Sequence, residues 1–126
     1  MDELLVERVL RAVEQVPRGR LVAYGDIARL VGTGPRQVGT IMRVWGGNVA
    51  WWRVTNASGE LPEHLREEAR KRWAEEGILP GSSGRSAPMS RYRADLVVLA
   101  RDWERACADL GPPADAASRS DHACAD

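Results

Sequence analysis

The 126-residue sequence predicts a mostly α-helical domain with a small β element. Two helix signals and one strand signal support this prediction. An apolar stripe at helical spacing begins after Asp2 and stops at Pro17, and the pair Gly34-Pro35 starts another helix. Between these signals, residues 21–23 have the composition of a short strand.

The predicted helices follow one another closely. Asp2 caps the first helix, and its apolar face ends before Pro17. That face consists of Leu5, Val9, Ala12, Val13 and Val16. A brief second helix begins near Asp26 and ends at Gly32, and a third begins at Pro35, so the two predict a helix-turn-helix.

The third predicted helix has two chemically different faces. One side carries Val38, Ile41, Met42 and Trp45, and the other carries Arg36, Gly39, Thr40 and Arg43. A glycine inside a helix costs roughly 1 kcal/mol relative to alanine, so Gly39 is expected where something approaches the backbone closely. A DNA groove or tight packing on another helix would both qualify.

Positive charge is concentrated in one part of a chain whose net charge is zero. Residues 17–53 contain a single acid, Asp26, and six arginines. The arginines are Arg18, Arg20, Arg29, Arg36, Arg43 and Arg53. Because phosphate neutralisation supplies much of the affinity for DNA, this clustering favours a DNA-binding surface over an ordinary solvated face.

The sequence divides into four segments. Residues 1–79 are the predicted domain, 80–90 a flexible linker, 91–110 a helix packed on the domain, and 111–126 a disordered tail. No apolar run is long enough for a bilayer and the chain opens on acidic residues, so we expect a cytoplasmic protein without a membrane partner. Two cysteines and two histidines without ligand spacing predict neither metal nor cofactor.

Three blocks between about Val9 and Ile78 occur in the order found in one DNA-repair family. They are residues 16–29 with Tyr24-Gly25, residues 36–43, and Ala50-Trp51-Trp52-Arg53-Val54 followed by Asn56 and Gly59. The sequence resembles the O6-alkylguanine-DNA alkyltransferases, which implies a winged helix-turn-helix DNA-binding domain like their C-terminal domain. Tryptophan at the position of their reactive cysteine is typical of the alkyltransferase-like branch, which binds alkylated DNA without repairing it.

The substitution matters because alkyl transfer needs a thiolate, an adjacent base and a group that holds the base. In the active family these are Cys, His and Glu. The resemblance puts Trp51 and Trp52 at the first two positions, and counting back seven residues from Gly77 puts Arg70 at the third. Both cysteines, Cys107 and Cys124, lie in the last fifth of the chain, where we expect a small apolar helix residue and an exposed tail thiol. The chain is therefore not expected to be an enzyme.

The resemblance also implies site residues. Arg36 matches the finger that fills the space of a flipped nucleotide, and Tyr24 matches the tyrosine that helps to rotate it outward. The implied DNA-binding residues are Tyr24, Arg36, Gln37, Gly39, Thr40 and Arg43. The implied lesion pocket consists of Tyr24, Trp51, Trp52 and Arg53.

Each of these residues has a simpler interpretation. Arg36 would be a surface arginine and Tyr24 a half-buried aromatic closing the core. Trp51 and Trp52 would alternate between core and rim on a strand over residues 49–54.

The sequence departs from the family in four places. Ala50 replaces Pro and Trp52 replaces His, and the stretch before Trp51 is about two residues shorter than in the active family. The loop over the flipped base is reduced to residues 60–64. The arginine that discriminates adducts in the alkyltransferase-like branch has two candidate replacements here, His64 and Arg66.

Three functions are consistent with the sequence. The first is a sensor that binds double-stranded DNA containing O6-alkylguanine, flips the damaged nucleotide, and marks it for nucleotide excision repair proteins. The second is a general helix-turn-helix DNA-binding protein or regulator with a closed pocket and no lesion preference. The third is a degenerate enzyme or protein-interaction module that does not bind DNA.

Overall fold

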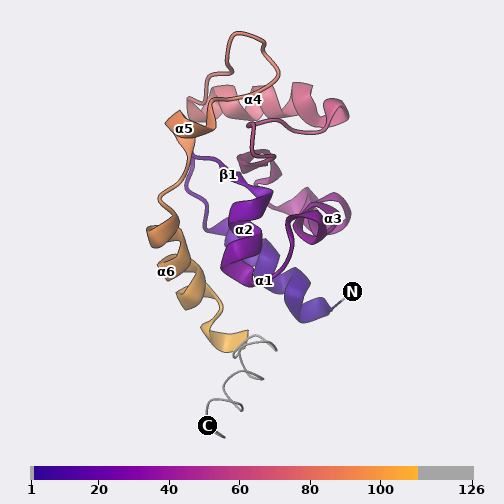
Figure 1. The fold of residues 1–126 in the computed structure, drawn as a ribbon, viewed down its shortest axis with the longest axis vertical. Coiled ribbons are helices and arrows are strands. Elements are labelled where there is room, and N and C mark those ends of the chain that lie inside the picture. Colours follow the sequence, from indigo (N-terminus) through magenta and orange to yellow (C-terminus); the bar gives the residue numbers. More distant parts are fainter. Residues whose placement is uncertain (1, 111–126) are drawn as a thin grey trace, which may run out of the picture.

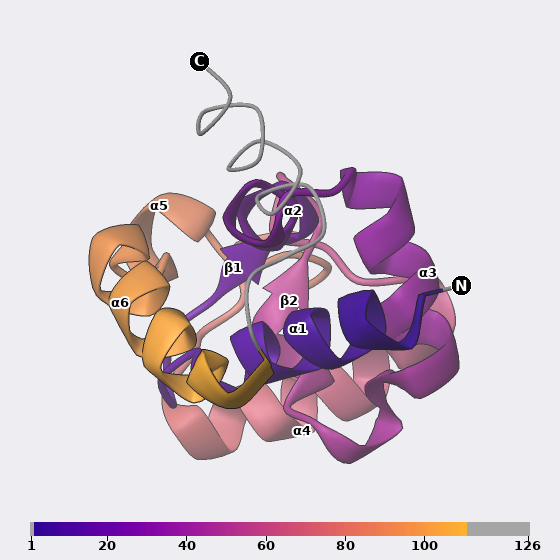
Figure 2. The same cartoon turned by 90° about the horizontal axis from the view of Figure 1, so that it is seen from below.

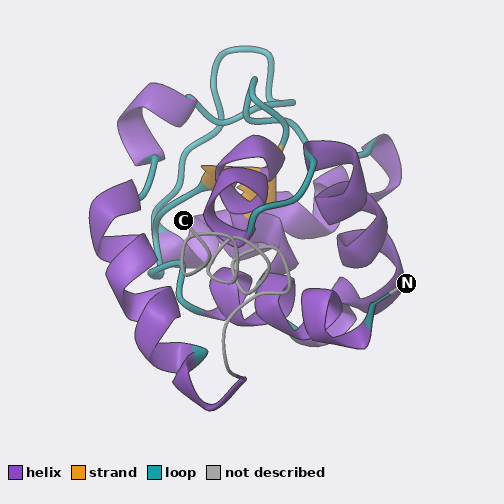
Figure 3. Cartoon of the chain, turned by 60° about the horizontal axis from the view of Figure 1, so that its bottom comes forward, coloured by secondary structure: helices purple, strands orange, loops and turns teal. Residues whose placement is uncertain are grey.

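The computed structural model describes residues 2–110, which form helices around one short pair of strands (Figure 1, Figure 3). The helices are α1 (Glu3–Glu14), α2 (Tyr24–Val31), α3 (Pro35–Trp45), α4 (Arg66–Glu76), α5 (Met89–Tyr92) and α6 (Leu96–Ala106). The strands β1 (Val22–Ala23) and β2 (Val54–Thr55) pair in parallel, with Val22 opposite Val54. The predicted mostly α fold with a small β element is confirmed. The expected tail, 111–126, including Cys124, lies outside the described residues.

A lower core joins the first three helices to α6. Asp2 caps α1 by accepting a hydrogen bond from the Leu4 amide at 2.9 Å, as the sequence predicts. Val9, Val13, Ile27 and other apolar residues of α1, α2 and α3 are fully buried in this cluster. In two perpendicular views α6 and α3 lie on opposite sides of α2 (Figure 1, Figure 2).

An upper core lies beneath α4, at the end of the molecule away from α1 (Figure 1). Trp73 is 2% exposed and packs with Leu21, Ile78 and Tyr92. The strand pair stands between the two cores, since Leu21 belongs to the upper cluster while Val22 and Val54 belong to the lower one. The fold therefore has two apolar clusters that meet at β1 and β2.

Helix α2 begins at Tyr24, two residues before the Asp26 start that the sequence predicted. Asp26 is instead the third helical residue, and its buried carboxylate accepts a hydrogen bond from the Ala23 amide at 2.9 Å. Arg93 donates to the same carboxylate at 2.7 and 3.1 Å, and Arg29 pairs with it at 2.8 Å. Asp26 thus both caps α2 and fixes the segment before α6 to the helix-turn-helix.

Residues 80–90, expected from their composition to be a flexible linker, are mostly exposed but form a turn that is attached to the domain at Ala87. The Gly81 amide donates to the Ser86 carbonyl at 2.7 Å and closes a tight turn. The Ala87 amide donates to the Gly59 carbonyl at 3.1 Å, and Ala87 is fully buried. Glycine and serine here build the turn, because turns and linkers use the same small residues.

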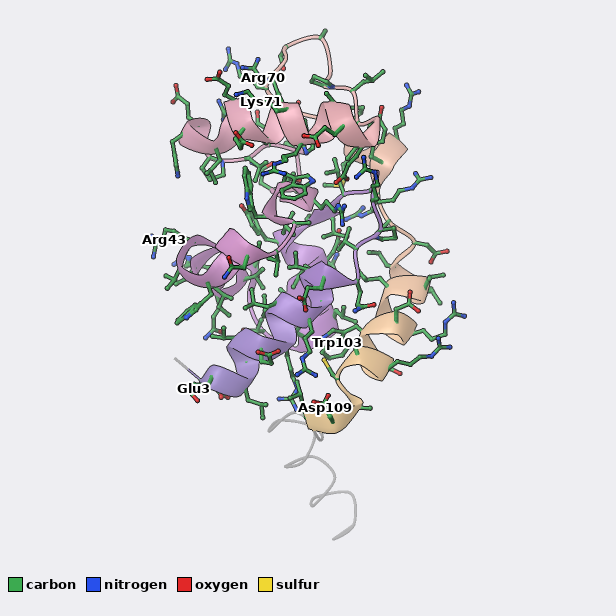
Figure 4. The ribbon with its side chains drawn as sticks, turned by 180° about the vertical axis from the view of Figure 1, so that it is seen from behind. Glu3, Arg43, Arg70, Lys71, Trp103 and Asp109 are labelled. Atoms are coloured by element: carbon green, nitrogen blue, oxygen red, sulfur yellow. The ribbon has the colours of Figure 1, made fainter. Side chains whose placement is uncertain are left out.

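Helix α6 is a docked helix. The Asp95 side chain accepts from the amides of Val97 and Val98. The indole of Trp103 lies between α6 and α1, where its Nε1 donates to the Arg8 carbonyl at 2.9 Å (Figure 4). Cys107 is buried in the same cluster. Among residues 2–110, no helix combines the length and apolar character needed to cross a bilayer.

The backbone of Gly59 lies directly against the backbone of Ala87, so replacing Gly59 should destabilise the fold. Its φ is +78°, and an added Cβ would stand 2.0 Å from the Ala87 carbonyl oxygen. We expect Gly59→Ala to lower the free energy of unfolding by about 3 kcal/mol, from left-handed strain plus the clash. Urea denaturation would measure it.

The matched control is Gly84→Ala. Gly84 has a similar φ, +73°, but an added Cβ would meet nothing within 4 Å. It should cost only the strain of about 1 kcal/mol. Equal losses in the two variants would show that the contact with Ala87 has no energetic role.

Candidate nucleic-acid interface and base pocket

The outward face of α3 presents the free arginines of the basic segment. Arg18 and Arg20 donate to the backbone carbonyls of Glu75 and Arg91, while Arg29 and Arg53 pair with Asp26 and Glu76. Arg36 and Arg43 are exposed, and their guanidinium groups make no hydrogen bond or ion pair with any other residue of 2–110. Figure 4 shows Arg43 pointing from α3 away from the body of the molecule. Of the six arginines, these two remain available to a partner.

Gly39 is half-exposed on the same helix. An added Cβ there would meet nothing within 4 Å. The alternative that Gly39 allows tight packing on another helix is therefore wrong for the described residues. The Thr40 hydroxyl donates to the Arg36 carbonyl at 3.1 Å, and Thr33 donates to Gln37 Oε1.

A cavity of about 370 Å³ opens beside α3. It is bounded by the start of α2, by a side of α3 that includes Gly39 and Arg43, by Trp51, and by four residues of the segment 61–65. The lining residues are Tyr24, Gly39, Met42, Arg43, Gly46, Gly47, Trp51, Val54, Leu61, Pro62, His64 and Leu65. Its volume falls in the range of pockets that hold small organic molecules. Of this lining, the sequence predicted Tyr24, Gly39, Arg43 and Trp51 as site residues and His64 as a candidate. The other lining residues are glycines and apolar side chains that no motif marks.

Trp51 and Tyr24 are the two aromatic residues of the cavity. Trp51 is half-buried, and its ring meets that of Trp52 edge to face, with centroids 5.7 Å apart. Burial raises the pKa of the Tyr24 phenol, so this hydroxyl stays protonated at neutral pH. The cavity thus has an apolar aromatic wall and a neutral phenol close to α3.

Trp52 and Arg53 do not line this cavity, although the sequence placed both in the lesion pocket. Trp52 Nε1 donates to Glu76 at 2.8 Å, and Arg53 donates to Glu76 and to the Val16 carbonyl. The reason is the 3-10 turn Trp51–Arg53, which spreads successive side chains around an axis with three residues per turn. The alternative of a strand over residues 49–54 is wrong, since β2 begins at Val54.

Glu76, and not Arg70, is the side chain that holds residue 52. Its carboxylate is 2% exposed and accepts hydrogen bonds from the Gly19 amide, Trp52 Nε1 and the Arg53 guanidinium. Burial alone raises the pKa of this carboxyl, but the hydrogen bonds from Arg53, Gly19 and Trp52 outweigh burial and lower it. Arg70 lies on the outer face of α4 (Figure 4). Of the three catalytic positions, the acid is therefore retained while the thiol and the base are not.

The sequence did contain a signal for the contact between Glu76 and Trp52, in the helical spacing of α4. Trp73 and Glu76 are three residues apart and share a face. Trp73 Nε1 donates to the Trp52 carbonyl at 2.7 Å, and Glu76 accepts from the Trp52 indole. A count along the sequence from Gly77 could not register this pairing.

The structure distinguishes His64 from Arg66, the two candidate replacements for the family's loop arginine. His64 lines the cavity, from the 3-10 turn Glu63–Leu65. Arg66 does not line it, because its Nε donates to the Leu61 carbonyl at 2.9 Å and the residue lines a separate outer hollow. Of the two candidates, His64 is thus the one that reaches the cavity.

Comparison with known proteins agrees with this geometry. Residues 5–77 match the family described as 6-O-methylguanine DNA methyltransferase, DNA binding domain. The DNA base-flipping proteins of Escherichia coli (strain K12) and Shigella flexneri are each 33% identical over 98 residues, covering 73% of this chain and 75% of theirs.

Two solved structures are similar in fold. S. pombe Atl1, in complex with damaged DNA containing O6-carboxymethylguanine, has 28% identity and a TM-score of 0.65. S. pombe ATL in complex with DNA has 29% identity and a TM-score of 0.64. Each comparison covers 75% of this chain and 98% of the other.

The chain therefore belongs to the family of 6-O-methylguanine DNA methyltransferase DNA-binding domains. Within that family it is an alkyltransferase-like protein, with Trp51 at the position of the reactive cysteine. Its mostly helical fold with a two-stranded sheet is the fold of Atl1.

Replacing Glu76 should remove a large, pH-dependent part of the stability. We expect Glu76→Gln to cost about 2 to 4 kcal/mol at pH 7, because it leaves a nearly buried Arg53 without its counter-charge. The lowered pKa means that the wild-type contribution is complete above pH 4.5, the ordinary value for the carboxyl, and is lost as pH falls through the lower folded value. Urea titrations from pH 7 to pH 3 should show the two proteins converging in acid.

Glu68→Gln is the matched control on the same helix. Glu68 pairs with Arg72 at 3.2 Å, but both side chains are nearly half-exposed, so the loss should stay within about 0.5 kcal/mol. If the difference in unfolding free energy between wild type and Glu76→Gln stays constant with pH, the ionised carboxylate of Glu76 is not the source of the lost stability.

Proposed function

We propose that this chain binds double-stranded DNA containing O6-alkylguanine and rotates the damaged nucleotide into the cavity beside α3. The observation that carries the proposal is the cavity itself, whose lining combines Gly39 and Arg43 of α3 with Trp51. A helix that enters the DNA groove would thereby bring a flipped base to the cavity mouth. Base extrusion is cheapest for a damaged base, so flipping adds selectivity.

The free face of α3 supports the same proposal. Arg36 and Arg43 have unpaired guanidinium groups among the described residues, and Gly39 leaves the backbone open to close approach. Arginine suits both phosphate contact and insertion into a base stack, because its guanidinium is flat and carries five donors. Arg36 is proposed to fill the gap left by the flipped nucleotide, and Tyr24 to crowd the adjacent backbone.

We propose that the bound alkyl group stays on the base. Transfer needs a thiolate, and the chain places Trp51 at the cavity wall instead. Cys107 is buried in the lower core, where burial raises the pKa of its thiol. Trp51 offers an apolar wall to the alkyl group, so the cavity binds without reacting.

A protein that leaves the lesion in place can assist repair only by directing other proteins to it. We therefore propose that the complex marks the lesion for nucleotide excision repair. Persistent flipping, with α3 held in the groove, would present a distorted duplex to those proteins.

The first test is a titration of two duplexes that differ only in one O6-methylguanine, at fixed salt. Wild type should prefer the alkylated duplex, and Arg36→Ala should reduce that preference about tenfold, or roughly 1.4 kcal/mol. Fluorescence of 2-aminopurine placed beside the lesion reports flipping directly, since lost stacking raises its emission.

Arg101→Ala is the matched control, because Arg101 is exposed on α6, on the side of α2 opposite α3. It should leave the preference unchanged. Equal affinity of wild type for both duplexes would favour a general DNA-binding protein, and no binding at all would favour an interaction module. Transfer of a labelled alkyl group to the protein would overturn the non-enzymatic proposal.

Gly39→Ala should separate stability from DNA binding. In the free protein the added methyl meets nothing within 4 Å, so helix propensity should stabilise the fold by up to about 1 kcal/mol. On DNA the same methyl would stand between the helix and the groove and weaken binding to both duplexes. Thermal melting and the duplex titration measure the two effects, and a variant that binds DNA as tightly as wild type would show that α3 does not approach DNA at Gly39.

A further inference from the structure

The start of α2 decides where the Tyr24 ring points. Tyr24 is the first residue of α2, lines the cavity beside α3 and packs, partly buried, against the lower core. Its phenol makes no hydrogen bond with another residue of 2–110. The direction of the ring therefore depends on that packing and on the backbone of the first helical turn.

Asp26 fixes the backbone of this first turn. The residue before α2 is Ala23, whose side chain cannot accept a hydrogen bond from the helix. Asp26 closes the turn instead, because its carboxylate, which is 0% exposed, accepts a hydrogen bond from the Ala23 amide at 2.9 Å. A buried carboxylate needs a positive partner, so whatever holds Asp26 also holds the start of α2.

Two arginines hold the Asp26 carboxylate, and they come from different places. Arg29 lies on α2 itself, is 73% exposed, and donates to Oδ1 at 2.8 Å. Arg93 comes from the segment before α6 and is 44% exposed. It donates from Nη2 to Oδ1 at 2.7 Å and from Nε to Oδ2 at 3.1 Å. Because Arg29 moves with the helix, Arg93 is the one of these two that ties Asp26 to another segment.

The backbone around Arg93 is itself fixed. The Leu21 amide donates to the Tyr92 carbonyl at 2.8 Å, and the Ala94 amide donates to the Leu21 carbonyl at 2.9 Å. These bonds place Arg93 beside the residue that precedes β1. Arg93 therefore connects the start of α2 to a segment outside residues 5–77, the part of the chain that matches the family.

Resting on the proposed function, we propose that Arg93 is a positioning residue for nucleotide flipping. Its two hydrogen bonds to Asp26 hold the first turn of α2, and with it Tyr24, in the place from which the tyrosine rotates a damaged nucleotide. Successive helical residues turn by about 100°, so Asp26 lies on the side of α2 away from Tyr24, and Arg93 supports the helix from behind. Arg93 does not line the cavity, so its effect on a flipped base passes through Tyr24.

The test compares the affinities of Arg93→Gln for two duplexes that differ only in one O6-methylguanine, at fixed salt. Glutamine removes the bidentate contact, while Arg29 still supplies a positive partner to Asp26. We expect the preference for the alkylated duplex to fall about fivefold, which corresponds to a coupling of about 1 kcal/mol between residues of one hydrogen-bond network. The affinity for the unmodified duplex should not change.

The ratio of the two affinities separates positioning from stability. Loss of folded protein lowers both affinities alike and leaves their ratio unchanged. Emission of 2-aminopurine beside the lesion, measured with saturating protein, gives a second readout. It should be lower with Arg93→Gln than with wild type, because a smaller fraction of the bound duplex is flipped.

Two further variants separate the bidentate contact from the charge. Arg93→Lys keeps the positive charge but lacks the planar fork of the guanidinium, so the preference should fall as it does in Arg93→Gln. Arg29→Gln is the matched control, since it removes the other arginine on the same carboxylate and should leave the preference unchanged. Wild-type preference in Arg93→Lys, or an equal loss in Arg29→Gln, would overturn the proposal.

A double-mutant cycle tests whether Arg93 acts through Tyr24. Tyr24→Ala should itself lower the preference, and adding Arg93→Gln should lower it no further. Losses that multiply would show that Arg93 acts independently of Tyr24. An unchanged preference in Tyr24→Ala would likewise rule out the route through the tyrosine.

The outcomes for Arg93 are distinct from failure of the function on which its role rests. If wild type prefers the alkylated duplex and Arg93→Gln keeps the whole preference, the lesion sensor stands and the positioning role is wrong. If Arg93→Gln weakens both duplexes equally, Arg93 is an ordinary contact or stability residue. If wild type binds both duplexes equally, the lesion preference itself fails and the positioning role fails with it.

Discussion

The buried carboxylate of Glu76 fixes the geometry on which the cavity beside α3 depends. Glu76, at the end of α4, accepts hydrogen bonds from the turn after α1 through the Gly19 amide, and from both Trp52 and Arg53. A buried charge is tolerated only when it is paired and hydrogen-bonded, so these donors cannot move independently. The indole of Trp52 is therefore held against α4, with Arg53 and Arg72 over its ring at 5.6 and 5.0 Å. Because Trp52 is fixed outside the cavity, the preceding turn leaves Trp51 on the cavity wall.

The position of the cavity follows from the two-core architecture. Tyr24, Met42 and Val54 of its lining belong to the lower core, whereas Trp51 and Leu61 belong to the upper one. Side chains at such a junction pack on one side only, which leaves room for a ligand. The parallel pair of β1 and β2 joins the two cores and leaves the cavity between them open. The cavity thus arises where two small cores meet beside α3.

Sequence reasoning located those features that depend on local chemistry. The cap at Asp2 and the start at Pro35 each follow from residues that satisfy or begin a helix within a few positions. The directions of Trp52 and Arg53 could not be predicted in this way, because they depend on a carboxylate 24 and 23 residues away. The same limit applies to residues 80–90, whose composition is typical of linkers, because the hydrogen bond from the Ala87 amide to the Gly59 carbonyl joins positions far apart in the sequence.

The clustered arginines show how far a binding surface can be predicted from composition. Three of the six arginines in the basic segment, Arg18, Arg20 and Arg53, contact residues far along the chain. Arg29 pairs with Asp26, three residues away on the same helix. Only a structure separates arginines that bind their own chain from those left for a partner, since both kinds have the same sequence signature. The pairing of Arg53 with Glu76 also shows that an arginine in a family motif can serve the scaffold beneath the site.

The contact between Trp52 and Glu76 does not provide the proton transfer that activates a nucleophile. An indole nitrogen donates a hydrogen bond and has no lone pair free to take a proton, unlike the imidazole of histidine. With tryptophan at this position, the carboxylate stabilises the orientation of a ring and nothing more. A relay of acid, base and nucleophile requires each member to pass a proton on, so the chain is broken at Trp52 before Trp51 is considered. Restoring a cysteine at position 51 alone would therefore leave a thiol without a base, and the retained Glu76 is best understood as a structural clamp.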